Sequence, residues 1–415
     1  MPEEGRRPIR WSAHARLDAL ADPDSLQGSW GSTGRLWVGS ARVEGRPAAL
    51  LVSEVKVDRG ALSAEAAERA ADRVRSAARA GDPVIWLVDS DGAEVAGGLP
   101  AVERSAALLD ALAEAEGRSL RLAVCHGFAG GVSGYGLALC DLAIGIASRS
   151  FTFVAGPAVV QAATGEASSL DEIGGTPVQL AAGTLAAEVA ADPQALAWVR
   201  AILALHRPID PIQPGSRGFE LPEPSRPYRA QDLAGSLVDE GSYLPLFEGY
   251  GPSVRVGLAR IEGRSVVWIQ SDPSRLSGAI DVHAARKVAR ILALAKALGR
   301  PVITLCDTPG FLPGAAQERA GILGAGAELI HAYARARAVV PTASVVIRRA
   351  VGAGAVLLFG SADRFALPGA EVVQMGARAA RSAYEGPGRP GITATMVELP
   401  RLREALGRWV ALDGG

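Results

Sequence analysis

The sequence predicts an α/β protein that contains two copies of one domain. Short apolar stretches typical of strands alternate with amphipathic stretches typical of helices, an order that favours a largely parallel sheet. Segments of the first half recur in the second half at a constant distance along the chain. The 415 residues suffice for two domains, and 48% hydrophobic with 21% charged residues is typical of a globular protein with a large core.

The internal repeat rests on segments that recur in one register. Gly45 in the first half corresponds to Gly263 in the second, an offset of 218 residues. Three pairs of segments share this offset: 41–46 with 259–264, 60–62 with 278–280, and 83–89 with 301–307. Further along, Gly130 and Gly131 match Gly352 and Ala353 at an offset of 222, as a small insertion would produce. We therefore expect two copies of one fold.

A run of prolines marks the boundary between the two copies. Residues 207–228 contain Pro208, Pro211, Pro214, Pro222, Pro224 and Pro227. Prolines at this density favour a stiff, extended connector rather than packed structure. We predict a lead-in helix within residues 1–25, a first domain at 26–206, the linker at 207–227 and a second domain at 228–415.

The elements of the first copy follow from its periodicity. Alternating stretches around Glu44 and Gly45 predict a hairpin, a 3.6-residue period with small residues predicts helices against a sheet, and short apolar runs predict buried strands. The expected elements are a hairpin at 36–43 and 48–54, a helix at 64–80, a strand at 84–88, a helix at 102–116, a strand at 120–125 before a glycine-rich turn, and a last helix of the chain at 402–410. Periodicity alone leaves open a Rossmann-like sheet or a spiral of ββα turns.

Composition and targeting signals exclude several function classes. A net charge of −1 argues against nucleic acid as a partner. Cys125, Cys140 and Cys306 form no CxxC pair, so we expect buried free thiols in a reducing cytoplasm and no metal site. The first residues lead into no apolar run, so no signal peptide is expected. Residues 122–147 are apolar but rich in glycine, which predicts a buried strand-turn-helix unit rather than a membrane span.

The usual catalytic motifs are absent from the sequence. It contains no phosphate loop, no GxSxG elbow and no HExxH pair. His126 lies closest to a glycine cluster, but we see no neighbouring carboxylate to orient it and interpret it as a structural histidine at a strand end. The other four histidines stand in no motif. The chemistry is therefore expected to depend on the main chain.

Two glycine-rich turns are the candidate chemical groups. Residues 127–131 and 351–355 each follow a strand and lead into a helix. Small residues there let a ligand oxygen approach free N–H groups at a helix N-terminus, and one such donor contributes about 3 kcal/mol to an oxyanion. Two equivalent turns suit two oxyanions. Carboxyl transfer needs both, an enolate on a thioester and a biotin ureido oxygen, whereas decarboxylation of a malonyl-type thioester needs only the first.

Further motifs resemble the carboxyltransferase (beta) subunits of biotin-dependent acyl-CoA carboxylases. In the first copy the similar segments are 156–160, 164–166 and 171–175, close to G-P-x-V-V, T-G-E and (D/E)-x-L-G-G. In the second copy they are 277–281 with Lys287, 307–314, 317–318, 321–322, 365–371 and 375–377. The resemblance covers nearly the whole chain. It implies an α/β fold of two tandem crotonase-like ββα-spiral domains related by the internal repeat.

The resemblance also implies roles for individual residues. The first oxyanion hole, for the thioester carbonyl, falls on Gly130 and Gly131, although the turn differs from G-P-C-x-G-G and its register stays open by one residue. The implied second hole, at the biotin, consists of Gly352, Ala353 and Gly354. The implied neighbours are Phe311, Leu312, Pro313 and Gly314 for biotin, Ser90, Asp91, Gly92 and Ala93 for coenzyme A, and Gly156, Pro157 and Val356 for the substrate.

The same resemblance implies partners. Biotin must come from a separate carrier with its biotin carboxylase subunit, because the chain has no Met-Lys-Met site among Met1, Met375 and Met396. The substrate is an acyl thioester of coenzyme A or of an acyl carrier protein. A homo-oligomer is implied, a hexamer built as a trimer of dimers, in which the first repeat of one subunit faces the second repeat of another. No membrane partner is expected.

Departures from the family pattern lie mostly on the biotin side. The family's R-K-A-Y-G-G-A-Y reads Arg348-Arg349-Ala350-Val351-Gly352-Ala353-Gly354-Ala355 here, without its tyrosines, and Leu367 replaces a tryptophan. Three hypotheses follow. The first is a carboxyltransferase, the alternative is a biotin-independent decarboxylase of a malonyl-type thioester, and the third is a non-catalytic subunit of a carboxylase or biosynthetic complex.

Overall fold

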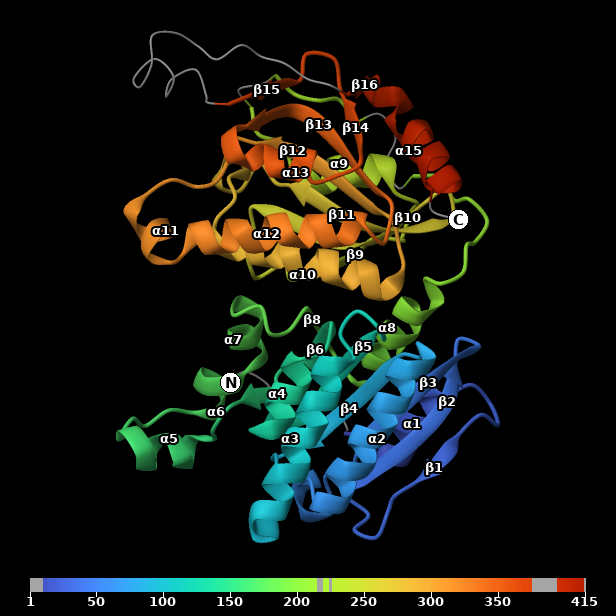
Figure 1. Ribbon diagram of the computed structural model, residues 1–415, viewed down its shortest axis with the longest axis vertical. Coiled ribbons are helices and arrows are strands. Elements are labelled where there is room, and N and C mark those ends of the chain that lie inside the picture. The colour runs from blue at the N-terminus through green and yellow to red at the C-terminus, as the bar shows by residue number, and fades with distance from the viewer. Residues whose placement is uncertain (1–9, 215–218, 224–225, 375–393, 414–415) are drawn as a thin grey trace, which may run out of the picture. The chain divides into compact units, whose positions relative to one another are not determined.

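The computed structural model describes residues 10–214, 219–223, 226–374 and 394–413. The chain divides into two compact units, Met1–Leu205 and His206–Gly415. Each unit is built on one eight-stranded sheet with helices packed on it (Figure 1). The prediction of an α/β protein is confirmed.

The first unit has the strand order β1-β2-β3-β4-β5-β6-β8, with β7 beside β5. The strands β1 to β3 are antiparallel, and the pairs from β3 onward are parallel. The strands are β1 (Gln27–Ser29), β2 (Leu36–Val43), β3 (Arg46–Ser53), β4 (Val84–Ser90), β5 (Arg121–Gly130), β6 (Leu142–Ile146), β7 (Phe151–Phe153) and β8 (Ala187–Val189). The helices are α1 (Ala13–Leu20), η1 (Asp58–Gly60), α2 (Ala64–Ala80), η2 (Val95–Gly97), α3 (Gly98–Glu114), α4 (Val132–Ala138), α5 (Pro157–Thr164), α6 (Leu170–Gly174), α7 (Thr176–Ala181) and α8 (Asp192–Ala204).

The second unit repeats this plan with the order β16-β14-β13-β12-β11-β10-β9 and β15 beside β13. The strands are β9 (Leu244–Leu246), β10 (Val254–Ile261), β11 (Arg264–Ser271), β12 (Val302–Thr308), β13 (Thr342–Val351), β14 (Asp363–Ala366), β15 (Glu371–Val373) and β16 (Thr395–Met396). The helices are α9 (Ala230–Leu237), η3 (Leu276–Gly278), α10 (Val282–Leu298), α11 (Ala315–Arg319), α12 (Ile322–Arg337), η4 (Gly352–Ala355), α13 (Val356–Phe359) and α15 (Leu399–Asp413). Figure 1 shows α10 and α12 side by side against the sheet, as α2 and α3 are in the first unit.

The long helix of each unit begins and ends with equivalent caps. In α2, the Ser63 side chain accepts from the N–H of Ala66, and Gly81 ends the helix with a left-handed φ of 74°. In α10, Asp281 and Gly299 do the same. An N-cap oxygen and a left-handed glycine satisfy main-chain groups that a helix leaves unpaired. The predicted bounds of α2 are confirmed because both caps are visible in the sequence.

The predicted strand β5 was too short. It was expected to end at residue 125, but it continues to Gly130, through most of the segment expected to be a turn. The pairing with β4 shifts register between Val88 and Ser90, and the extension gains a second neighbour in β7. The segment 122–147 forms β5, α4 and β6, as predicted for a buried unit. Within the described ranges, no helix combines the length and apolar character that crossing a bilayer requires.

The proline-rich segment packs on the second unit more than we expected. Phe219 and Leu221 are partly buried against the core of that unit, and the Phe219 ring lies 5.7 Å from the Tyr228 ring. The main chain is also held, since the Ile209 N–H donates to the Gly263 carbonyl at 3.0 Å. The expectation of an unpacked connector is therefore wrong for these residues, because apolar side chains between the prolines bury themselves on the nearest core.

Candidate functional site

Two main-chain segments meet at the carboxyl ends of β4 and β5 in the first unit. A Cβ atom added to Gly92, which has a φ of +113°, would lie 2.8 Å from the Gly130 oxygen and 3.7 Å from the Val132 nitrogen. The same contact recurs in the second unit. A Cβ atom on Gly310 would lie 2.9 Å from the Val351 oxygen. Only glycine permits approaches this close, so both units bring their two turns together in the same way.

One free N–H group of the first unit belongs to Ala93. Ala93 and Leu62 form an isolated parallel bridge. The N–H of Leu62 donates to Gly92 at 2.7 Å, and the N–H of Glu94 donates to Leu62 at 2.9 Å. In a parallel bridge of this kind the middle residue turns its own N–H to the other side. The Ala93 N–H has no acceptor in the described part of the chain.

The second free N–H group belongs to Val132. Gly131, with a φ of +49°, caps α4, and its own N–H donates to the Phe153 carbonyl at 3.0 Å. Val132 is the first helical residue, and its N–H has no acceptor among the described residues. Gly130 and Gly131 thus shape the turn, while Val132 carries the available donor, one residue after the sequence-based register. Val132 is recognised as the donor by its position at the start of a helix, directly after a glycine with positive φ.

The second unit presents the corresponding pair. Phe311 bridges Ile280 in the same pattern, and its N–H has no described acceptor. Ala353 follows Gly352, whose φ is +59°, and its N–H is likewise without a described acceptor. These positions relate Gly131 to Gly352, an offset of 221, so the offset of 222 read from the sequence was wrong by one residue. The β-pairings agree, because Leu122 pairs with Leu142 as Ala343 pairs with Asp363.

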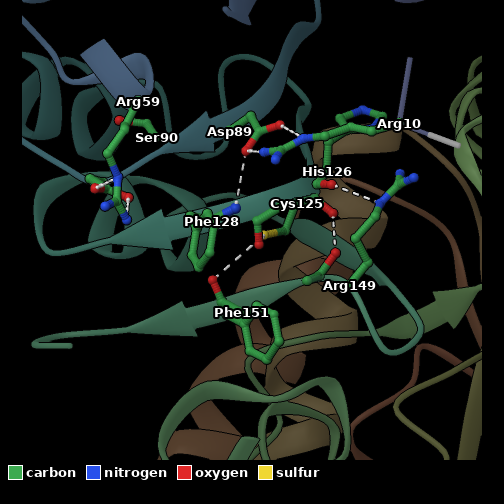
Figure 2. Close-up of polar contacts among 12 residues, drawn as sticks. Arg10, Arg59, Asp89, Ser90, Cys125, His126, Phe128, Arg149 and Phe151 are labelled. Atoms are coloured by element: carbon green, nitrogen blue, oxygen red, sulfur yellow. Dashed lines mark hydrogen bonds and ion pairs between the residues drawn. The ribbon is translucent and has the colours of Figure 1, made fainter. Parts of the chain in front are cut away.

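The other predicted residues take supporting places around these donors. The Ser90 hydroxyl accepts from the Gly92 N–H at 3.1 Å and from Ser133 at 2.9 Å, so it holds the loop rather than facing a ligand. Thr308 does the same for Gly310 at 3.1 Å. Asp91 pairs with Arg59, whose guanidinium lies 5.9 Å from the centre of the Phe128 ring (Figure 2).

The remaining site predictions are placed as follows. Gly354 packs on Gly310, where a Cβ atom would come within 2.5 Å of the Gly310 Cα. The Phe153 ring lies between Gly130 and Gly156, at 3.0 and 3.7 Å from the Cβ positions of those glycines. Pro157 is the first residue of α5, and Val356 is the first residue of α13. In the loop after Phe311, the Leu312 N–H donates to the Ile280 carbonyl, Pro313 is exposed, and Gly314 caps α11. The predicted motif at 375–377 lies outside the described residues.

A buried aspartate holds the strand end beneath each site. In the first unit Asp89 accepts from Arg10 and from the Phe128 N–H at 3.2 Å (Figure 2). In the second unit Asp307 accepts from Arg348 at 2.7 Å. Arg348 corresponds to Gly127 in the repeat, and a Cβ atom on Gly127 would lie 2.5 Å from Asp89 Oδ1. The glycine therefore leaves room for a guanidinium that comes from the lead-in segment instead.

His126 has a carboxylate partner that we did not expect. Its Nδ1 lies 2.5 Å from Asp192 Oδ1, and Arg149 also donates to Asp192, at 2.6 Å. The statement that no carboxylate orients His126 was wrong, because Asp192 is distant in sequence and reaches β5 from α8. The ring is fully buried, and this burial lowers its pKa to about 4. A neutral imidazole closed to solvent fits a structural role better than that of a base.

The three cysteines are free and buried, as predicted. Burial raises the pKa of Cys125 to about 11, so its thiol is protonated at neutral pH. Among the residues that the structure describes, no three His, Cys, Asp or Glu side chains are grouped to hold a metal ion. The chemical groups presented by the two sites are main-chain donors.

Known proteins resemble this chain along most of its length. The carboxyl transferase domain family matches residues 31–384. The propionyl-CoA carboxylase beta chain of Saccharopolyspora erythraea is 31% identical over 370 residues, which cover 82% of this chain and 67% of that protein. The mitochondrial propionyl-CoA carboxylase beta chain of Homo sapiens is 30% identical over 386 residues, 88% of this chain and 70% of that protein.

Solved structures share the fold. A transcarboxylase 12S crystal structure with methylmalonyl-coenzyme A and methylmalonic acid bound superposes with a TM-score of 0.88 at 24% identity, covering 98% of this chain and 90% of that one. A second 12S structure, with hydrolysed methylmalonyl-coenzyme A, gives a TM-score of 0.86 at 23% identity, with 97% and 90% covered. The predicted two-domain crotonase-like fold is confirmed. The chain belongs to the carboxyl transferase family, that of the carboxyltransferase (beta) subunits of biotin-dependent acyl-CoA carboxylases.

Proposed function

We propose that the chain moves a carboxyl group between carboxybiotin on a separate carrier and the α-carbon of an acyl-CoA, with each of its two turns holding one oxyanion. The observation that carries the residue assignment is the recurrence of two unpaired N–H groups in each unit, Ala93 with Val132 and Phe311 with Ala353. Unpaired donors are costly to leave inside a protein, and their repetition at equivalent positions argues for ligands that accept from them.

The first pair suits the thioester. Loss of the α-proton moves electron density onto the carbonyl oxygen, which becomes an enolate oxygen. Ala93 and Val132 donate to that oxygen, and because neither N–H has an acceptor among the residues that the structure describes, none of the described hydrogen bonds must break. Each donor of this kind contributes about 3 kcal/mol to the transition state. Gly92, Gly130 and Gly131 provide the approach that a side chain would obstruct.

The second pair suits the biotin ring. Gly354 packs directly on Gly310, since a Cβ on Gly354 would approach the Gly310 Cα to 2.5 Å, and this contact holds the two segments that carry the donors together. Phe311 and Ala353 would hold the ureido oxygen there, with Leu312, Pro313 and Gly314 on the same side. When bound, biotin supplies the carboxyl group and a ureido nitrogen that accepts the α-proton. The residues present therefore fit the group.

The proposed partners follow from the family. The transcarboxylase 12S neighbour is described as a hexamer with substrate bound to a multienzyme core, which supports a homo-oligomer for this chain and, as the finer proposal, a hexamer. The carrier and its biotin carboxylase subunit are separate chains. The thioester is carried by coenzyme A or an acyl carrier protein, near Ser90 and Asp91, and we place the protein in the cytoplasm.

A specific observation favours a second candidate function. Val351 and Ala355 stand where the family has tyrosines, and Leu367 replaces a tryptophan and is buried at 2% exposure. Val351 and Ala355 flank the second turn, Leu367 lies in the core of the second unit, and none of the three belongs to the first unit. A decarboxylase of a malonyl-type thioester needs only the first oxyanion pair, so it would tolerate them.

One experiment separates the two functions. The pure protein is incubated with malonyl-CoA and methylmalonyl-CoA, with and without a carboxylated biotin carrier, and carbon dioxide and carboxylated carrier are measured. Exchange that depends on the carrier supports carboxyl transfer. Release of carbon dioxide at the same rate without the carrier would contradict it and support the decarboxylase. If a folded oligomer neither releases carbon dioxide nor exchanges carboxyl groups with the carrier in any condition, both functions are contradicted.

A further inference from the structure

The second unit contains a polar cavity that the proposed reaction does not use. It has a volume of about 260 Å³ and lies at the β9–β10 edge of the sheet, beside α10. Lys287 and Asp272 line its interior, and Arg255, Arg275 and Glu248 line the rest of its wall. The candidate turns of the same unit lie at the ends of β12 and β13, with β11 between them and this edge.

Lys287 is the buried cation of this cavity. Lys287 is 2% exposed. Among the described residues, its ammonium donates to one acceptor, the Phe247 carbonyl, at 3.3 Å. An ammonium has three donors, so two of them have no acceptor among the described residues. Burial, and then the nearby charge of Arg255, lower the pKa of Lys287 to about 7 although Asp281, Glu248 and Asp272 oppose this.

The carboxylates of the cavity are already engaged. Asp272 accepts from the Ser274 N–H at 3.1 Å and from its hydroxyl at 2.6 Å. Glu248 pairs with Arg255. The Arg275 side chain is exposed and has no acceptor among the described residues. Lys287, Arg255 and Arg275 thus share the cavity wall with Glu248 and Asp272, and Asp281 acts on Lys287 from outside the wall.

The first unit carries a different cation at the equivalent position. Arg69 corresponds to Lys287, and its guanidinium donates to the Ser29 carbonyl at 2.9 Å and to the Ser29 hydroxyl at 2.8 Å. Trp37 corresponds to Arg255, so the first unit has an apolar side chain where the second unit has a charged one. The second unit therefore departs from the repeat at two positions: Lys287 exchanges one cation for another with fewer donors, and Arg255 adds a charge where the first unit has Trp37.

We propose that this cavity binds one small oxyanion, a carboxylate, bicarbonate or phosphate, between the buried Lys287 and the peripheral Arg275. A volume of about 260 Å³ equals the share of roughly eight waters and is too small for most drug-sized ligands. The anion accepts from the donors of Lys287 that have no acceptor among the described residues, and it pairs with the exposed Arg275 guanidinium. Its charge also favours protonation of Lys287, so binding takes up a proton.

Isothermal titration calorimetry of the intact protein tests the site with acetate, bicarbonate and inorganic phosphate at constant ionic strength. Measurements with acetate just above the Lys287 pKa of about 7, in two buffers of different ionisation enthalpy, count the protons that Lys287 takes up, because acetate itself does not titrate in this range. We expect one anion per chain with proton uptake. The anion with the lowest Kd shows whether the site is built for a carboxylate, for bicarbonate or for phosphate.

Matched variants assign the effect to its residues. Lys287→Met should weaken binding at least tenfold and abolish proton uptake, and Arg275→Gln should weaken binding about tenfold with uptake retained, as losing one charge-assisted bond predicts. Arg335→Gln, on the exposed face of α12, should change nothing. Absence of binding by all three anions, or equal Kd values in all variants, would overturn the proposal.

Discussion

At the scale of single residues, the candidate site depends on which N–H groups lack an acceptor. Gly131 has the conspicuous sequence position, yet its N–H is used by Phe153. Val132 and Ala353 have small apolar side chains, and their N–H groups have no acceptor in the described part of the chain. The glycine that marks the turn in the sequence is therefore not the residue that carries the available donor. A substitution that removes only the N–H group is the sharpest test.

Proline at the two open positions removes the donor with little other change. Proline is favoured at the first position of a helix, which Val132 occupies in α4, and no hydrogen bond is lost. We expect Val132→Pro to lower acyl-CoA turnover about 10²- to 10³-fold, as loss of one oxyanion donor does. Ala353→Pro should lower carrier-dependent transfer similarly and spare any carrier-independent decarboxylation. Steady-state kinetics measures both.

The matched variants keep the N–H. Val132→Ala should retain activity within a few-fold, and circular dichroism should show all the variants folded. If Val132→Pro is folded and fully active, the thioester oxyanion is held elsewhere.

The buried His126 makes stability depend on pH. Its folded pKa of about 4 lies below the value of 6.5 for a free histidine, so the unfolded chain binds the proton more readily. The stabilising effect is complete above about pH 6.5 and is lost as the pH falls towards 4. His126→Asn retains a donor towards Asp192 but cannot titrate. Urea unfolding across this range should show a shallower loss of stability in the variant than in the wild type; identical slopes would assign the acid sensitivity to other groups.

At the scale of elements, the loops that precede and follow α2 and α10 depend on glycines of two kinds. Gly60 and Gly81 both have positive φ, but a Cβ atom on Gly60 would lie 2.1 Å from the Asp89 oxygen, while Gly81 has nothing within 4 Å. Gly81→Ala should therefore cost about 1 kcal/mol of stability, from its backbone conformation alone. Gly60→Ala should cost about 3 kcal/mol or more, because the loop must also move off β4.

Urea midpoints of the two variants test this ranking. Gly278→Ala and Gly299→Ala offer the same comparison in the second unit, where a Cβ atom on Gly278 would lie 2.4 Å from the Asp307 oxygen and Gly299 is unobstructed. Equal losses within either pair would mean that the loops do not pack on β4 and β12 as described.

The sequence was sufficient for elements whose ends are encoded locally. The bounds of α2 follow from Ser63 and Gly81, which act within the helix itself. The extension of β5 could not be predicted, because it depends on pairing with β7, more than twenty residues further along the chain. The partner of His126 was missed for the same reason, since Asp192 comes from α8. The glycine turns were visible in the sequence, but which N–H they leave free depends on a hydrogen bond to Phe153.

At the scale of the whole molecule, the two units keep one plan and differ in detail. Both have an aspartate at the end of the central strand, but its guanidinium comes from Arg10 in one unit and from Arg348 in the other. Arg69 donates to Ser29 in the first unit, whereas Lys287 at the equivalent position donates to the Phe247 carbonyl. Duplication preserved the main-chain donors, whereas the side chains around them diverged, which agrees with a division of labour between a thioester site and a biotin site.

This division can be tested by mixing two inactive variants. If each active site combines the first repeat of one subunit with the second repeat of another, as we propose from the family, a mixed dimer of Val132→Pro and Ala353→Pro contains one site with both defects and one with neither. Random reassembly of equal amounts should restore about a quarter of wild-type carboxyl transfer. Each variant reassembled alone should stay inactive. If both donor pairs of one reaction belong to the same chain, every site keeps a defect and mixing restores nothing.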